Sequence, residues 1–188
     1  MSVKKTHSGP GTYFCTFTCW RWLSLFEMTK LHDNIYSWLR QMVNKGHKVV
    51  AFVIMPNHMH LLLHISDNRQ TINKIIANGK RFLAYEIVKR LKASGELEIL
   101  QRLQQAVQPE ERARNKKHRV FEISSDIKQC ESEDFLLQKL EYIHANPVTG
   151  KWNLAEDFVK YSHSSACYYE LNENHPEVSI THYLDIDL

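Results

Sequence analysis

The sequence predicts an α+β fold in which helices pack on one face of a central antiparallel sheet. Strand-like and helix-like segments follow one another in the order strand, helix, strand, strand, helix, strand, helix. The chain of 188 residues, 43% of them hydrophobic, is long enough for one domain with a buried core. With 6 Gly and 5 Pro, it is neither collagen-like nor of low complexity.

The first half of the chain predicts three strands and one helix. Residues 12–20 show an alternating pattern of residue types and are rich in Thr and aromatic side chains, which is typical of a strand. Apolar residues at helical spacing predict a helix over 31–43, and Gly46 follows as its stop. The β-branched run 47–55 predicts a buried strand, and a Pro-Asn turn connects it to a further strand over 58–65.

The second half predicts two helices, with a polar segment and a strand between them. Apolar spacing predicts a helix over 71–92, in which Gly79 costs about 1 kcal/mol relative to Ala. Residues 93–118 are polar and charged and predict a loop with some helix, and 120–127 predict a fourth strand. The last helix covers 131–144 and ends before Pro147. We therefore expect a single domain over 1–171 and an acidic tail over 172–188.

Charge is divided unevenly along the chain, although the net charge is only +3. Residues 69–119 contain 13 Lys and Arg against 5 Asp and Glu, whereas residues 131–188 contain 3 against 11. A basic central third suits a polyanion such as nucleic acid. A solvated helix face followed by a lysine-rich loop would produce the same composition, so both interpretations stay open at this point.

The cysteine pattern and the lengths of the apolar stretches indicate in which cellular compartment the protein is expected. The 4 Cys form no C-x-x-C pair, which argues against a zinc ribbon. Free thiols and a polar N-terminus without a signal sequence favour the reducing cytoplasm. No apolar stretch approaches the roughly 20 residues of a membrane helix, so we expect no membrane partner.

Among the 11 His, His58 and His60 have a spacing that suits metal binding. Side chains two residues apart on a strand point to the same face, so the two imidazoles can hold one metal ion. His64 has the same parity but lies further along the strand. Because two His leave a divalent ion incompletely coordinated, a third ligand must come from elsewhere. Two sheet histidines without a metal, or a structural metal site closed by His64, stay open as alternatives.

The end of the last helix carries a second candidate group, Tyr142 and Asn146. These residues are four apart, so they lie one turn apart on one helical face. The Asn146 oxygen can complete a His-His-Asn metal site with the Tyr142 hydroxyl nearby. A phenol with its ordinary pKa of about 10 is a poor nucleophile at neutral pH, but a metal that polarises a phosphate makes its attack feasible. The structural alternative is a partly buried Tyr and a capping Asn.

Three segments resemble motifs of the single-tyrosine HUH transposases, which move small insertion sequences as single-stranded DNA. Ile54-Met55-Pro56-Asn57-His58-Met59-His60-Leu61-Leu62 is similar to their His-hydrophobic-His strand. Tyr142-Ile143-His144-Ala145-Asn146-Pro147-Val148 is similar to their catalytic helix, in the Asn-Pro-Val form of the REP-associated tyrosine transposases. Tyr161-Ser162-His163-Ser164-Ser165-Ala166 is similar to their closing element.

The resemblance implies a ferredoxin-like HUH nuclease fold and a complete active site. His58, His60 and Asn146 match the ligands of Mg²⁺ or Mn²⁺, and Tyr142 matches the nucleophile. The implied activity is cleavage and rejoining of single-stranded DNA, with hairpin ends as partner, through a 5′-phosphotyrosine intermediate. Many members are dimers, so a homodimer is a further implied partner. The basic residues that we expect to track the DNA backbone are Lys74, Lys80, Arg81, Lys89, Arg90, Arg114, Lys116, Lys117 and Arg119.

Two other functions are alternatives to a transposase. A domesticated, non-mobile DNA-binding or nicking protein would keep the same scaffold and the same residues. A two-histidine phosphoesterase would need two separate His-x-Ser/Thr motifs, and His163-Ser164-Ser165 is the one segment that fits. The phosphoesterase is therefore the weaker of the two alternatives.

Overall fold

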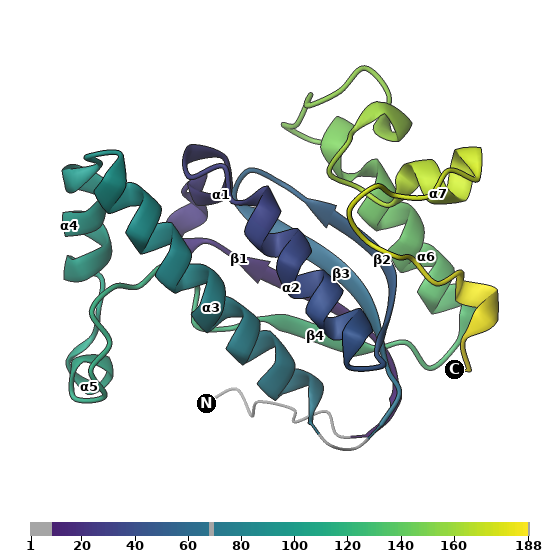
Figure 1. Cartoon of the computed structure of the whole chain (residues 1–188), viewed down its shortest axis with the longest axis horizontal. Coiled ribbons are helices and arrows are strands. Elements are labelled where there is room, and N and C mark those ends of the chain that lie inside the picture. Colours follow the sequence, from purple (N-terminus) through teal and green to yellow (C-terminus); the bar gives the residue numbers. More distant parts are fainter. Residues whose placement is uncertain (1–8, 68–69, 188) are drawn as a thin grey trace.

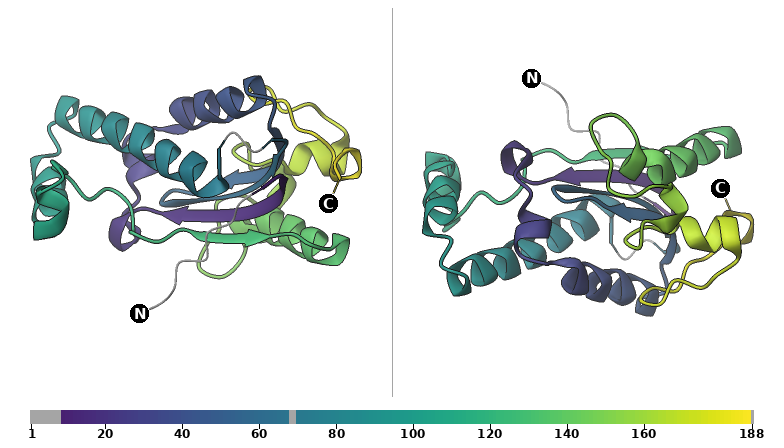
Figure 2. Two further views of the ribbon diagram at one scale, coloured as in Figure 1. Left: turned by 90° about the horizontal axis from the view of Figure 1, so that it is seen from below. Right: turned by 90° about the horizontal axis from the view of Figure 1, so that it is seen from above.

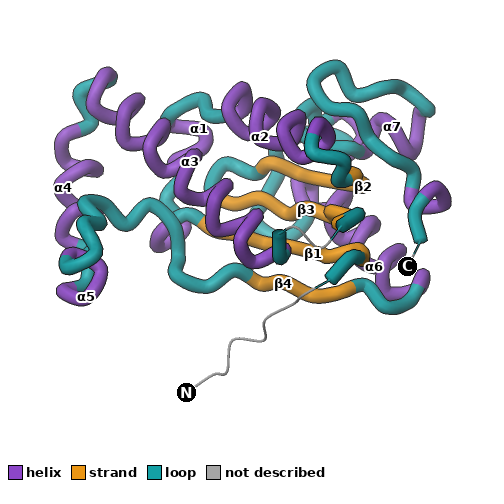
Figure 3. The backbone as a smooth tube through the Cα atoms, turned by 60° about the horizontal axis from the view of Figure 1, so that its bottom comes forward, coloured by secondary structure: helices purple, strands orange, loops and turns teal. Residues whose placement is uncertain are grey.

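The computed structural model describes residues 9–67 and 70–187, with an antiparallel sheet at its centre (Figure 1). The strands lie in the order β2-β3-β1-β4 (Figure 3). Their bounds are β1 (Gly11–Thr18), β2 (Lys48–Ile54), β3 (His58–Ile65) and β4 (Asp126–Gln129). The predicted α+β class is therefore confirmed. The N-terminal residues 1–8, and Arg69 at the start of the basic stretch, lie outside the described residues.

Helices cover both faces of the sheet. Helices α2 (His32–Asn44) and α3 (Ile72–Ala93) lie on one face, and α6 (Glu133–Ala145) lies on the other (Figure 2). The expectation of helices on one face was wrong, because β3 buries apolar side chains on both of its faces. Leu61 and Leu63 join the core under α2 and α3, whereas Leu62 joins the core under α6. Three His on the α6 face of this strand made that face look polar in the sequence.

Shorter elements connect these layers. Within the segment predicted as a loop with some helix, α4 (Leu97–Gln105) and α5 (Pro109–Arg112) form an arm at one end of the molecule (Figure 1). The remaining short helices are α1 (Leu25–Met28), α7 (Ala166–Leu171) and the 3-10 turns Trp20–Trp22, Asn146–Val148, Phe158–Lys160 and Tyr183–Asp185. Among the described residues, no helix combines the length and hydropathy that crossing a membrane requires.

The fourth strand lies later in the chain than the sequence predicts. Residues 126–129 pair with β1, whereas the segment expected to form the strand was 120–127. Val120 and Phe121 are buried in the core beneath α2 and α3, and Phe121 makes an isolated bridge with Cys19. Their apolar character therefore reflects burial in the core rather than membership of a regular strand.

Segments from the end of the chain cover the outer edge of β2. Ile54 donates its backbone N–H to the His163 carbonyl at 2.8 Å, and the Thr181 N–H bonds to Val49 O at 2.9 Å. Residues 172–187 run back over the domain, with His175 and Val178 buried. An edge strand covered in this way is protected from pairing with other chains.

Gly79 sits at the contact between α3 and α2, where a larger residue would collide with Trp38. A Cβ added at Gly79 would lie 2.6 Å from the Trp38 atoms Cε2 and Cζ2. We predict that Gly79→Ala destabilises the protein by about 1–3 kcal/mol in urea unfolding, because overpacking outweighs the gain in helix propensity. The cost should shrink in a Trp38→Leu background, where the colliding ring is absent. A stabilised Gly79→Ala variant would contradict this account.

Candidate active site

The two His of the predicted metal site lie together on the α6 face of β3. His58 and His60 occupy the first and third positions of the strand, and both are buried. Their ring centroids are 4.8 Å apart. His60 is also stacked on Phe14 of β1, with centroids 5.6 Å apart. The strand period of two therefore places the imidazoles side by side, as expected from the sequence.

Hydrogen bonds determine which nitrogen of His58 carries a proton. Asn57 Nδ2 donates to the Trp22 carbonyl at 2.9 Å, so the Asn57 amide has one defined orientation. Its Oδ1 lies 2.7 Å from His58 Nδ1 and can only accept, so that nitrogen donates. The Nε2 atom of neutral His58 consequently keeps its lone pair for a ligand.

The same reasoning applies to His60. Thr16 Oγ1 lies 2.7 Å from His60 Nδ1, and Asn146 Nδ2 lies 3.3 Å from His60 Nε2. Because an amide NH₂ group can only donate, Nε2 accepts and Nδ1 carries the proton. Hydrogen bonds to the distal nitrogen are how proteins orient metal-binding imidazoles.

Burial keeps both imidazoles neutral at neutral pH. Loss of hydration lowers the pKa of His58 to about 4, and the positive charge of Lys151 adds to this effect. Asn146 opposes it, because its amide oxygen could accept a hydrogen bond from the protonated ring. Loss of hydration lowers the pKa of His60 to about 3, helped by His58 and Lys139. The neutral imidazole is the form that binds a metal ion.

Asn146 brings an oxygen with unused hydrogen-bonding capacity to the His pair. The residue is buried at the end of α6, and its Oδ1 has no hydrogen-bond partner in the described part of the chain. A buried acceptor without a partner is unfavourable unless something else occupies it, and a cation would do so. The two imidazoles and the Asn146 oxygen therefore fit a divalent ion, which would replace the hydrogen bond from Asn146 Nδ2 to His60 Nε2.

His64 does not join this group. Its Nδ1 lies 3.1 Å from Thr12 Oγ1, at a strand position four residues beyond His60. Within 9–67 and 70–187, no cluster of three or more His, Cys, Asp or Glu side chains could hold a metal ion. A third protein ligand at the His pair must therefore be of another type, which favours Asn146 over the closed structural site with His64.

Tyr142 lies next to the pair on the exposed side of the site. Its ring centroid is 5.0 Å from that of His60 and 6.0 Å from that of Phe14. The residue is 48% exposed, so a large substrate can approach its hydroxyl. Lys139, one turn earlier on α6, has its Nζ 5.8 Å from the Tyr142 ring centroid. A phenol hydroxyl, an ammonium group and an amide oxygen thus lie along one face of α6 and its C-cap, Asn146.

Contacts on the other side of α6 hold this stripe in place. Leu140 and Ile143 pack into the core against β2. His144 Nε2 lies 2.9 Å from Ser165 Oγ, and the Ser165 N–H donates to Phe52 O at 3.0 Å. The closing element therefore connects α6 to the edge of β2. His144 faces away from the His pair and acts in the fold rather than in the site.

Several residues of the site were not identified from the sequence. Lys139 had a usable signal, because it precedes Tyr142 by three residues on a predicted helix. Thr16 had no signal in the sequence, since its contact depends on the pairing register of β1 and β3 that places it opposite His60. Asn57 lies directly before the His pair, but its role depends on the fold of a distant turn.

The basic residues predicted to contact DNA do not lie beside the His pair. Those on α3 lie on the opposite face of the sheet (Figure 2), and those after α5 belong to the arm. Lys80 Nζ donates to the Glu122 carbonyl at 2.7 Å, and Lys89 pairs with Glu86 at 3.3 Å. Arg119 and Lys116 both pair with Glu111. The exposed members of the set are Lys74, Lys89, Arg81, Arg114, Lys116 and Lys117.

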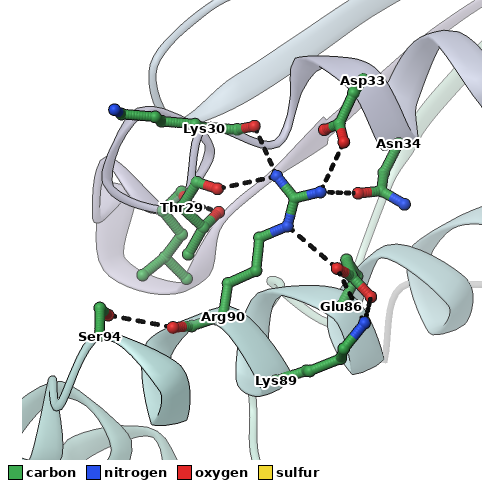
Figure 4. Close-up of polar contacts among 9 residues, drawn as sticks. Thr29, Lys30, Asp33, Asn34, Glu86, Lys89, Arg90 and Ser94 are labelled. Carbon is green, nitrogen blue, oxygen red and sulfur yellow. Dashed lines mark hydrogen bonds and ion pairs between the residues drawn. The ribbon is translucent and has the colours of Figure 1, made fainter.

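Arg90 has a structural role, in which all three guanidinium nitrogens donate hydrogen bonds within the protein (Figure 4). Its partners are the side chains of Glu86, Asp33 and Asn34 and the backbone carbonyls of Thr29 and Lys30. The guanidinium beside Asp33 holds the pKa of that carboxyl below its usual value. Arg90 thereby connects α3 to the start of α2, which leaves it poorly suited to a DNA phosphate.

Comparison with known proteins shows the fold of this chain. No protein-family model matches the sequence, and no curated protein matches it either. The four-stranded antiparallel sheet with helices on it has the fold of the HUH tyrosine transposases, as the sequence motifs predict.

The chain resembles in particular a REP-associated tyrosine transposase whose structure was solved bound to a REP hairpin. The two are 14% identical, the match covers 88% of this chain and 82% of that one, and the TM-score is 0.58. A candidate transposase from Deinococcus radiodurans R1 is 18% identical over 76% of this chain and 95% of that one, with a TM-score of 0.39.

Proposed function

We propose that this protein is a transposase that cleaves and rejoins single-stranded DNA through a tyrosine nucleophile. The observation that supports the proposal most is the convergence of His58, His60, Asn146 and Tyr142. These side chains come from β3 and from the end of α6, and His60 and Asn146 are 86 residues apart in sequence. The likeness in fold to a REP-associated tyrosine transposase, solved with a DNA hairpin, supports the same class of reaction and substrate.

His58, His60 and Asn146 are the residues that would hold Mg²⁺ or Mn²⁺. Two nitrogen donors and one amide oxygen suit Mn²⁺ better than Mg²⁺, since Mg²⁺ prefers oxygen ligands and gives up water reluctantly. A bound divalent cation there would withdraw negative charge from a phosphate and make its phosphorus more electrophilic. The neutral state of both buried imidazoles favours ion binding without a change of protonation.

Tyr142 would attack the phosphorus of the scissile phosphodiester. A bond forms between the tyrosine oxygen and phosphorus, and the bond from phosphorus to the 3′-oxygen breaks. The phenol proton is released to solvent, which reaches the half-exposed side chain, and the departing 3′-oxygen takes up a proton. The products are a 5′-phosphotyrosine and a free 3′-hydroxyl. Attack by a different 3′-hydroxyl reverses these steps and rejoins strands.

Lys139 would assist by its charge. Its ammonium group lies over the Tyr142 ring and close to Phe14, on the side of α6 that faces the site. A cation in this position attracts the phosphate and stabilises negative charge that develops on the tyrosine oxygen. Because Tyr142 contacts His60 of its own chain, the site can operate in cis, and homodimerisation stays a prediction.

The proposal is tested with hairpin oligonucleotides whose single-stranded flanks are randomised in sequence. With Mn²⁺ present, we expect a covalent protein–DNA adduct and a released strand that ends in a 3′-hydroxyl. Chelation with EDTA should abolish both products, and added Mn²⁺ should restore them. An adduct that forms equally well in EDTA would contradict the metal role, and folded protein that cleaves no member of the pool would contradict the function. Cleavage without rejoining would favour the domesticated nicking protein.

A further inference from the structure

An exposed tryptophan, Trp22, lies beside the His pair although it takes no part in the core. The residue is 55% exposed and belongs to the turn that follows β1. Its ring meets the His58 ring edge to face, with centroids 5.4 Å apart and planes at 72°. A large aromatic side chain left in solvent next to a polar site indicates a binding surface.

The backbone holds Trp22 in an unfavourable conformation. Arg21 and Trp22 have φ values of 49° and 58°, in the left-handed region that bulky residues rarely adopt. Two side chains secure the turn: Asn57 donates to the Trp22 carbonyl at 2.9 Å, and Glu122 accepts from the Arg21 N–H at 2.8 Å. Strain that is held by specific hydrogen bonds in this way is typical of functional sites.

Two more side chains extend this surface around His58. The Trp152 ring lies 6.2 Å from the His58 ring and is partly buried against the core under α6. Lys151 Nζ lies 6.0 Å from the Trp22 centroid and 5.0 Å from the Trp152 centroid. We call Trp22, Lys151 and Trp152 the tryptophan cluster. It places aromatic faces and a cation together at the edge of the His pair, from two segments far apart in sequence.

We propose that the tryptophan cluster binds the unpaired nucleobase next to the scissile phosphate, which stacks on Trp22 while Lys151 contacts the DNA backbone. This inference rests on the proposed function, which puts a phosphate at His58 and His60. Bases and phosphates alternate along single-stranded DNA, so a base follows directly where the cluster lies. In a duplex the base faces are covered by stacking, whereas an unpaired base offers a free face to an aromatic ring.

The test measures DNA binding with Tyr142→Phe as the background, so that no covalent step occurs. An oligonucleotide from the cleaved pool is compared with versions that carry one abasic residue at each position flanking the cleaved bond. Trp22→Ala should weaken binding of the intact oligonucleotide about 5- to 150-fold, as expected for loss of one stacked base. At one flanking position, Trp22→Ala should weaken binding of the abasic oligonucleotide by less than about twofold, because the nucleobase that would stack on Trp22 is already absent.

Two matched variants separate stacking from unfolding. Trp22→Phe should restore most of the affinity, because it keeps an aromatic face. Tyr85→Ala removes an aromatic residue that is 73% exposed on α3, and it should leave affinity within about twofold. Thermal melting of each variant verifies that its fold is intact.

Equal losses for intact and all abasic oligonucleotides, or no loss at all, would overturn the nucleobase subsite. In either case, adduct formation by the unchanged chain would still support the proposed function. An unchanged chain that neither binds nor attaches to any oligonucleotide would overturn the function and the subsite together.

Discussion

Tyr142→Phe is expected to abolish covalent attachment to DNA, lowering adduct formation by at least about 10³-fold in the hairpin assay. The substitution removes the one oxygen that would bond to phosphorus and keeps the ring that contacts His60 and Phe14. Because the side chain is half exposed, the free energy of unfolding should change by no more than about 0.5 kcal/mol. Non-covalent DNA binding should persist, since the phosphate contacts are unchanged.

A matched control for this variant is Tyr85→Phe, which removes an equivalent hydroxyl from an exposed position on α3. It should form the adduct at the rate of the unchanged chain. Persistence of the adduct in Tyr142→Phe would show that another residue is the nucleophile, and our assignment would be wrong.

His60→Gln is expected to lower Mn²⁺ affinity by at least about 100-fold, measured by isothermal titration calorimetry. Loss of a residue that merely orients a ligand typically costs 10- to 100-fold, so loss of a ligand itself should cost at least as much. DNA cleavage at a fixed Mn²⁺ concentration should fall in parallel. Part of the cleavage should return at high Mn²⁺, because His58 and Asn146 remain.

His64→Gln is the control for this experiment, since His64 lies on the same strand and the same face as His60. Its substitution should leave Mn²⁺ affinity within about twofold, because it is bonded to Thr12 and lies outside the group around Asn146. Equal losses in the two variants would indicate a metal site that includes His64, which would restore the structural alternative.

The parts of this molecule that could be predicted from the sequence depend on local periodicity. A period of two placed His58 and His60 on one face of a strand, and a period near 3.6 placed Tyr142 and Asn146 on one face of a helix. The His pair lies within β3, and Asn146, although it is the C-cap of α6, keeps helical backbone angles, so both patterns are present in the structure. The HUH fold expected from the motifs is confirmed by the structural likeness.

The parts that could not be predicted depend on contacts between distant segments. Arg90 looked like a DNA contact until its partner Asp33, 57 residues away, was placed beside it. Gly79 looked like a weak point in a helix, whereas its missing side chain makes room for Trp38. Trp22 carried no pattern at all, because its position beside His58 follows from the turn that Asn57 secures.

The most direct test of the central claim is to identify the residue that carries DNA in the covalent adduct. Digestion of the adduct with nuclease and protease, followed by mass spectrometry, locates the modified side chain. We predict a nucleotide 5′-phosphate on Tyr142, in a peptide that also contains Asn146. A nucleotide on any other residue, such as Tyr161 or Ser164 of the closing element, would contradict the account.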